Sequence, residues 1–111
     1  FVNESDVVIC SSDATFFDSH VTFGMASALE PVGLMRRIGL GETLRMALMG
    51  NDERVSADTA LRIGLVSEVV PASELRARAR GLARRLVAEI ARRLPARSCP
   101  GKSQSDRGRC L

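Results

Sequence analysis

The chain has 111 residues, which is enough for one small domain or for part of a larger one. Hydrophobic residues make up 45% and charged residues 26%, a composition typical of globular rather than disordered proteins. No apolar run approaches the roughly 20 residues that cross a bilayer, and three scattered cysteines with one histidine argue against a disulfide framework and a metal site. We therefore expect a cytoplasmic protein with no membrane partner.

The first half of the chain opens with extended segments. Val7-Val8-Ile9-Cys10 is a short β-branched run that predicts a strand of a parallel sheet, with Cys10 as a small buried hydrophobe. Residues 14–23 predict a further extended segment, which Asp18-Ser19-His20 interrupts as a polar elbow. Residues 24–29 are mostly small and predict a loop.

Helices are expected next, because proline and glycine punctuate an apolar pattern. Glu30-Pro31 suits the first turn of a helix, and Gly39 and Gly41 end it. A second helix follows and stops at Gly50.

A third, shorter helix is predicted over residues 57–63. Ser56 is a good N-cap for it, and Gly64 ends it. Residues 65–70 then predict a strand that Pro71 closes.

The last predicted element is a long amphipathic helix that Ser73 caps. Its apolar residues recur at three- and four-residue steps: Leu75, Ala79, Leu82, Leu86, Ile90 and Leu94. Basic residues are unevenly spread, with eleven basic and three acidic side chains in residues 72–111 against five and ten in residues 1–71. Without interleaved aromatics, these arginines favour a solvated helix face over a nucleic-acid contact, and a contact to the phosphates of a ligand is the remaining alternative.

From Pro95 the periodicity is lost. Residues 95–111 hold almost no large apolar side chains, so we expect a disordered tail, which an out-of-frame or truncated reading would explain. The predicted division is a folded portion over residues 1–94 and this tail over residues 95–111.

Two stretches carry a resemblance to a known family. Ser5-Asp6-Val7-Val8-Ile9-Cys10 and Asp13-Ala14-Thr15-Phe16 resemble a strand and a following segment of the enoyl-CoA hydratase/isomerase (crotonase) superfamily. Residues 49–71 resemble its T-G-x-x-[IV]-x-A-x-x-A-x-x-x-G-L-V-x-x-V-V-P run, with helix, glycine cap, strand and proline at the matching offsets. The resemblance covers residues 6–94 and implies the C-terminal half of the domain.

The resemblance implies an α/β fold of the partial crotonase-like β/α superhelix type, and a homo-oligomer, either a trimer or a hexamer. It also implies an acyl-CoA thioester as the substrate, with no separate cofactor. In the family, two backbone N–H groups stabilise an enolate and carboxylates move protons. By the same resemblance, the segments that carry those N–H groups and the first catalytic glutamate match positions before Phe1. The second glutamate position is taken by His20, and an aspartate position of some members by Ala28.

Candidate site residues follow from this match. His20 could move protons, since imidazole titrates near neutrality, and Asp18 two residues earlier could orient it from the same side of an extended segment. The alternative is that both are polar residues at the pocket mouth, a turn or a subunit contact. Phe16, Phe17, Met25 and Glu30 are candidate substrate-binding residues. For the phenylalanines and Met25 the alternative is a place in the core, and for Glu30 a helix-start charge.

Two functional hypotheses remain open at this stage. The first is an enoyl-CoA hydratase/isomerase-family protein that works by enolate stabilisation and is inactive as the fragment stands. The second is a non-catalytic interaction fragment that docks to crotonase-type oligomers, or a pseudogene product.

Overall fold

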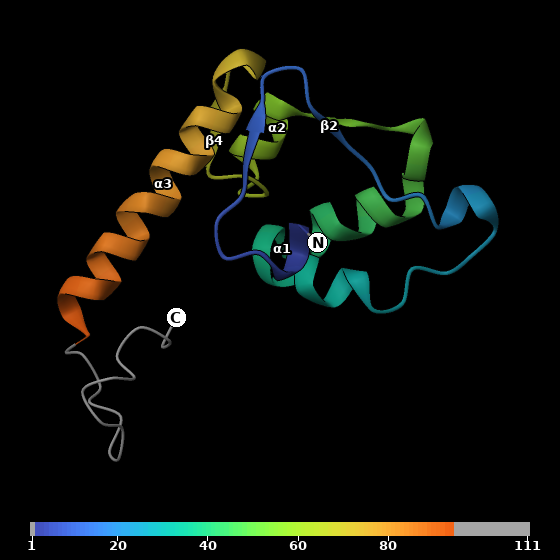
Figure 1. Ribbon diagram of the computed structural model, residues 1–111. Coiled ribbons are helices and arrows are strands. Elements are labelled where there is room, and N and C mark those ends of the chain that lie inside the picture. The colour runs from blue at the N-terminus through green and yellow to red at the C-terminus, as the bar shows by residue number, and fades with distance from the viewer. Residues whose placement is uncertain (1, 95–111) are drawn as a thin grey trace. The chain divides into compact units, whose positions relative to one another are not determined.

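The structure is a computed structural model that describes residues 2–94, shown in Figure 1. The chain divides into two units, Phe1–Ala79 and Arg80–Leu111. Strands and helices alternate along the described residues, so the expected mixed α/β class is confirmed. The predicted tail and its boundary at residue 95 lie outside the described residues.

The first unit contains a two-stranded parallel sheet. β1 (Ile9–Ser11) pairs with β4 (Glu68–Val70), with Cys10 opposite Val69. The pairing confirms the predicted parallel sheet, although β1 begins two residues later than expected. The Ser67 backbone N–H and hydroxyl both donate to the Val8 carbonyl oxygen, at 2.8 and 2.9 Å, and extend the join beyond the strands.

A second, antiparallel pair lies next along the chain. β2 (Thr15–Phe16) pairs with β3 (Val55–Ser56), and Phe16 is opposite Val55. This pairing fixes the point from which the polar elbow departs, because β2 ends at Phe16.

α1 (Glu30–Met49) consists of two helical segments that meet at Gly39. The backbone of Gly39, with φ 81° and ψ 167°, breaks the helix at the glycine where the sequence predicted an end. The hydroxyl of the fully buried Thr43 donates to the Gly39 carbonyl oxygen at 2.7 Å, so the break leaves that acceptor satisfied. A 3₁₀ turn, Gly50–Asp52, follows α1.

α2 (Ala57–Arg62) confirms the predicted N-cap. The Ser56 hydroxyl accepts from the Thr59 backbone N–H at 3.3 Å, and Gly64 adopts φ 81° just after the helix. The strand that follows is shorter than expected. Leu65 and Val66 precede β4 and are almost completely buried in the core.

α3 (Ala72–Arg93) starts before the expected cap. Ser73 lies inside the first turn, so the prediction that Ser73 caps the helix is wrong, and the Glu74 backbone N–H donates to the Pro71 carbonyl oxygen instead. Arg78 anchors this turn within the first unit through two hydrogen bonds to Glu68, at 2.7 and 2.9 Å. Among the helices within residues 2–94, none combines the length and apolar character that a membrane crossing needs.

The core of the first unit gathers buried side chains from β1, α1, α2 and the two residues before β4, and Phe16 and Val55 of the second sheet are partly buried against it. Its buried members are Cys10, Leu34, Ile38, Met46, Ala57, Ala60, Leu65 and Val66. Burial raises the pKa of the Cys10 thiol, which fits the predicted role of an inert hydrophobe. On the Arg80–Leu111 unit, by contrast, the apolar stripe is exposed at Leu86 and Ile90 in α3 and at Leu94 directly after it.

Candidate functional site

The polar elbow is part of a chain reversal between β2 and α1. After Phe16 the chain enters a 3₁₀ turn, Val21–Phe23, and returns through residues 24–29 to the start of α1. The Met25 backbone N–H donates to the His20 carbonyl oxygen at 2.9 Å, and Gly24 turns the chain with φ 69°. The reversal brings the loop of small residues back over Asp18 and His20.

Asp18 and His20 form the predicted carboxylate–imidazole pair. The His20 Nδ1 atom lies 2.6 Å from Asp18 Oδ1, and the same oxygen accepts the His20 backbone N–H at 2.9 Å. The predicted reason was wrong, however. His20 has helical dihedrals, φ −59° and ψ −51°, so a turn rather than an extended segment joins the two side chains.

Two further side chains complete the cluster. The Ser27 hydroxyl donates to Asp18 Oδ2 at 2.7 Å. Glu30 Oε1, at the start of α1, lies 3.6 Å from His20 Nε2. The imidazole therefore lies between two carboxylates, one at each ring nitrogen.

This arrangement changes the proton affinities of both members of the pair. The hydrogen bond to Asp18, against a smaller opposing effect of desolvation, raises the pKa of His20, and the charges of Asp18 and Glu30 raise it further. For Asp18, burial acts to raise the pKa, but hydrogen bonds from His20 and Ser27 outweigh it and lower the pKa. The pair thus favours an imidazolium beside a carboxylate.

The cluster lies at a cavity of about 240 Å³. Apolar side chains from the N-terminal turn, β2, α1 and the segment before β4 form its interior, and Asp18, Ser19, His20 and Glu30 form its polar part. The complete lining is Val2, Phe16, Phe17, Asp18, Ser19, His20, Glu30, Leu34, Met46 and Leu65. A titratable imidazole beside a largely apolar cavity is chemically suited to an organic ligand with a polar end.

Five of the six residues predicted from the sequence line this cavity: Phe16, Phe17, Asp18, His20 and Glu30. Met25 does not line it, and its side chain is 55% exposed. The alternative of a core position holds in part for Phe16, which packs against the core, but not for Phe17, whose ring lies 4.2 Å below the Arg54 guanidinium.

The sequence reasoning missed Ser27 and the apolar lining residues Val2, Leu34 and Leu65. The sequence pattern marked Leu34 only as part of a helix stripe and Leu65 only as part of a strand, and Val2 carried no signal. No local pattern marked Ser27, because its partner is nine positions away. Within the part of the chain that the structure describes, no group of three potential ligands is placed to hold a metal ion.

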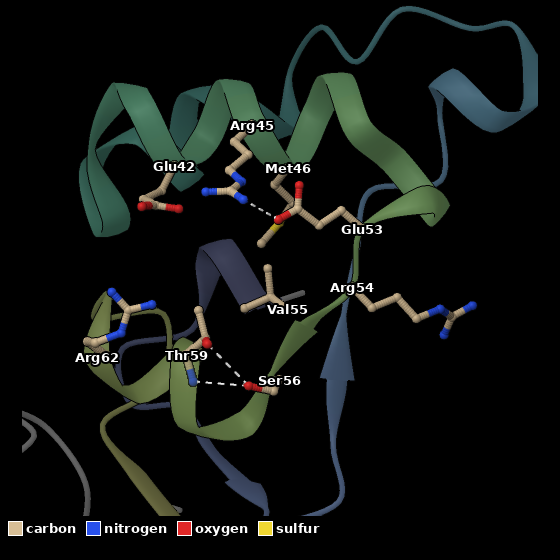
Figure 2. A pocket seen from close by; sticks show the side chains of 9 residues that line it. All are labelled: Glu42, Arg45, Met46, Glu53, Arg54, Val55, Ser56, Thr59 and Arg62. Atoms are coloured by element: carbon tan, nitrogen blue, oxygen red, sulfur yellow. Dashed lines mark hydrogen bonds and ion pairs between the residues drawn. The ribbon is translucent and has the colours of Figure 1, made fainter.

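A second cavity of about 290 Å³ lies between the second half of α1 and the segment from Glu53 to α2, as Figure 2 shows. One ion pair crosses it, with Arg45 2.5 Å from Glu53. Ser56 and Thr59 bond to each other at 3.2 Å as part of the α2 cap. The lining therefore offers this ion pair, further charged side chains and capping hydroxyls, and no imidazole or thiol.

Comparison with known proteins shows the family of the chain. The sequence profile described as enoyl-CoA hydratase/isomerase matches residues 1–97. The chain belongs to the enoyl-CoA hydratase/isomerase family. A relative in this family, the short-chain-enoyl-CoA hydratase of Clostridium acetobutylicum, is 36% identical over 83 residues, which are 74% of this chain and 31% of that protein.

Solved structures of enoyl-CoA hydratase/isomerase-family proteins are also similar to this chain. An enoyl-CoA hydratase/isomerase from Mycobacterium paratuberculosis superposes with a TM-score of 0.73 at 44% identity, over 77% of this chain and 34% of that one. Human enoyl coenzyme A hydratase domain-containing protein 3 superposes with a TM-score of 0.72 at 31% identity, over 78% and 34%. The chain spans about a third of the length of these family members.

Proposed function

We propose that this chain forms the proton-transfer side of an acyl-CoA site in an enoyl-CoA hydratase/isomerase-family protein. The observation that carries the proposal is the His20 imidazole, held between Asp18 and Glu30 beside an otherwise apolar cavity. At about 240 Å³ the cavity is below the range of roughly 300–1,000 Å³ usual for whole ligands. It therefore suits the acyl end of a thioester rather than the complete coenzyme A.

The chemistry would be proton transfer next to an enolate. With Asp18 holding the Nδ1 proton, Nε2 is the nitrogen that can give or take a proton at the substrate. The exposed fractions of the side chains agree with this division, since Asp18 is 10% exposed and Glu30 is 53% exposed. A substrate would displace Glu30 from Nε2 more readily than Asp18 from Nδ1.

An enolate also needs donors for its oxygen, and stabilisation of that oxygen usually supplies the largest part of the rate. We infer that these N–H donors belong to segments other than residues 1–111, as the resemblance implies. Residues 1–111 alone would then position a proton without lowering the barrier for its transfer. No cofactor besides the thioester's own coenzyme A enters the proposal.

The same reasoning extends to architecture. We propose that the first unit is the C-terminal part of a crotonase-like β/α superhelix within a homo-oligomer, a trimer or a hexamer, in the cytoplasm. The exposure of Leu29, Leu40 and Leu48, at 82%, 58% and 69%, favours further chain packed on the loop before α1 and on α1 itself. This exposure also favours the second candidate function, a non-catalytic fragment that docks to crotonase-type oligomers.

Exchange of the α-protons of butyryl-CoA with deuterated water tests the proposal without assuming a reaction subtype. The 111-residue chain alone should give no exchange above buffer. A chimera in which residues 1–94 replace the matched segment of the Clostridium hydratase should exchange, and His20→Ala in it should slow exchange by about 10²–10⁴-fold.

Each sample answers a separate question. Exchange by the chain alone would contradict the inference that the oxyanion donors lie elsewhere. A chimera that exchanges equally with and without His20 would contradict the role of the imidazole, and would leave docking as the better reading of the chain.

A further inference from the structure

Asp18 is held at both of its carboxylate oxygens. Oδ1 accepts from the side chain and the backbone of His20, at 2.6 and 2.9 Å, and Oδ2 accepts from the Ser27 hydroxyl at 2.7 Å. The Asp18 side chain is only 10% exposed, so water has little access to replace a lost partner. Ser27 reaches this position from the returning loop, nine residues along the chain.

The second oxygen matters because the terminal torsion of an aspartate is broad and nearly two-fold. A carboxylate bonded at Oδ1 alone can rock about that contact, and the direction of its lone pair toward the imidazole then varies. A hydroxyl at Oδ2 removes this freedom. The orientation of Oδ1 toward His20 therefore depends on Ser27 as well as on the length of the turn.

We propose that Ser27 is a positioning residue that acts on His20 through Asp18. By fixing the carboxylate, it keeps a proton on Nδ1 of His20 and leaves Nε2 as the reacting nitrogen, between Glu30 and the cavity. The catalytic meaning of this role rests on the proposed function, whereas the effect on the imidazole is a property of the chain alone.

The proton balance is simple. When the imidazolium gives its Nε2 proton to the α-carbon of an enolate, the N–H bond breaks, a C–H bond forms, and the imidazole is left neutral with its proton on Nδ1. Asp18 stays ionised throughout, and Ser27 keeps its own proton. Ser27 thus sets which tautomer the transfer leaves behind.

Few charges compete at this point. The charged side chains that line the cavity with His20 are Asp18 from the same turn and Glu30 from α1, and the other lining residues are apolar or carry a hydroxyl. A change at Ser27 should therefore reach the imidazole through Asp18. Apart from Asp18 and Glu30, no charged side chain of the cavity lining complicates the titration of His20.

The chain contains one histidine, so its ring signals in a nuclear magnetic resonance spectrum are unambiguous. In the full 111-residue protein, Ser27→Ala should lower the pKa of His20 by about 0.5 unit, roughly threefold in proton affinity, since a mobile carboxylate favours the imidazolium less. The ¹⁵N shifts of the neutral ring at high pH should also move from the Nδ1–H tautomer toward a mixture.

Two controls isolate the hydroxyl. Ser27→Thr keeps the hydroxyl and should behave as wild type. Valine is nearly isosteric with threonine but has no hydroxyl, so Ser27→Val should behave as Ser27→Ala. Ser19→Ala removes a hydroxyl that lines the same cavity and should leave the titration unchanged. The Thr and Val pair keeps the comparison decisive if the alanine variant folds poorly.

The proposal is overturned if Ser27→Ala and Ser27→Val titrate and show ring ¹⁵N shifts as wild type does, or if Ser19→Ala shifts the pKa equally. These measurements use no substrate. A failure of acyl-CoA binding or exchange would therefore sink the proposed function and leave the role of Ser27 standing, and the reverse also holds.

Discussion

The two carboxylates at His20 differ in how firmly they hold it. Asp18 contacts Nδ1 at 2.6 Å from a largely buried position, and Glu30 faces Nε2 at 3.6 Å from a half-exposed one. Shielding from water strengthens the first contact, whereas solvent weakens the second. The tight contact therefore defines the orientation of the ring, and the looser one marks the nitrogen that a ligand can reach.

The raised pKa of His20 predicts a pH-dependent contribution to stability. Because the folded-state pKa lies above the unfolded value near 6.5, the contribution is complete below pH 6.5 and is lost as pH rises through the folded-state pKa. The low pKa of Asp18 adds nothing to this window, since that carboxyl is ionised in both states above pH 6. Urea unfolding of wild type and His20→Gln should show a larger stability difference at pH 6 than at pH 9.

Glu30→Gln is the matched control for this comparison. It keeps the shape of the side chain and removes the weaker of the two charges, so a smaller part of the pH dependence should disappear than in Asp18→Asn. A difference between wild type and His20→Gln that is constant from pH 6 to pH 9 would contradict the coupling of His20 to its carboxylates.

The sequence singled out side chains that the structure brings together where their chemistry is distinctive. His20 is the one histidine of the chain, and Asp18 and Glu30 are acids near it in sequence. Met25 does not line the cavity, and the sequence could not show this because flexible apolar side chains carry no directional signal. Ser27 was missed because serine is common in loops and its contact depends on a chain reversal.

At the scale of elements, the turn that carries the site is packed against the end of α1. A Cβ atom on Gly50 would overlap Val21 Cγ1 and would lie 3.2 Å from the Asp18 carbonyl oxygen. The Asn51 backbone N–H also donates to the Thr22 hydroxyl at 3.4 Å. The backbone of Gly50 thus allows the site-bearing turn to lie close against α1.

Gly50→Ala should therefore disturb both stability and the site. Its φ of 56° disfavours a side chain, and the overlap with Val21 adds to the cost, so we expect a loss of about 1–3 kcal/mol in the free energy of unfolding. The His20 ring signals should shift as the turn moves away. Urea unfolding and the single-histidine spectrum measure the two effects.

Gly41→Ala provides the matched control. Gly41 lies in α1, has no left-handed backbone angle, and has no atom within 4 Å of the added carbon. Its unfolding free energy should stay within about 1 kcal/mol of wild type, on the stabilising side. Equal effects of the two substitutions would show that Gly50 has no special role in holding the turn.

Elements were predictable where a residue type has a single backbone role. Ser56 as an N-cap and Gly39 as a helix break followed from such residues, and the parallel strand at Cys10 followed from a β-branched run. Ser73 misled because the first turn of α3 begins directly after Pro71 and uses the proline carbonyl instead. The start of the strand before Pro71 was misplaced because Leu65 and Val66 are buried in the core, and a buried apolar pair has the same sequence pattern as a strand.

At the scale of the whole molecule, one cavity joins segments that are far apart in sequence. Val2, Phe16, Leu34 and Leu65 meet behind the polar cluster, so the cavity needs the N-terminal turn, β2, α1 and the segment before β4 at once. No local sequence pattern predicts that these segments meet, and only the resemblance to the family suggested a shared site. The chain spans about a third of the length of its relatives.

The central proposal is that the acyl group of a thioester contacts this cavity. Nuclear Overhauser effects from the acyl protons of crotonyl-CoA to the side chains of the 111-residue protein measure that contact directly. We predict effects to Phe16, Leu34 and Leu65, with a shift of the His20 ring signals that free coenzyme A does not cause. Effects confined to exposed side chains such as Phe23 and Leu29, or none at saturating ligand, would contradict the assignment of the cavity to the acyl group.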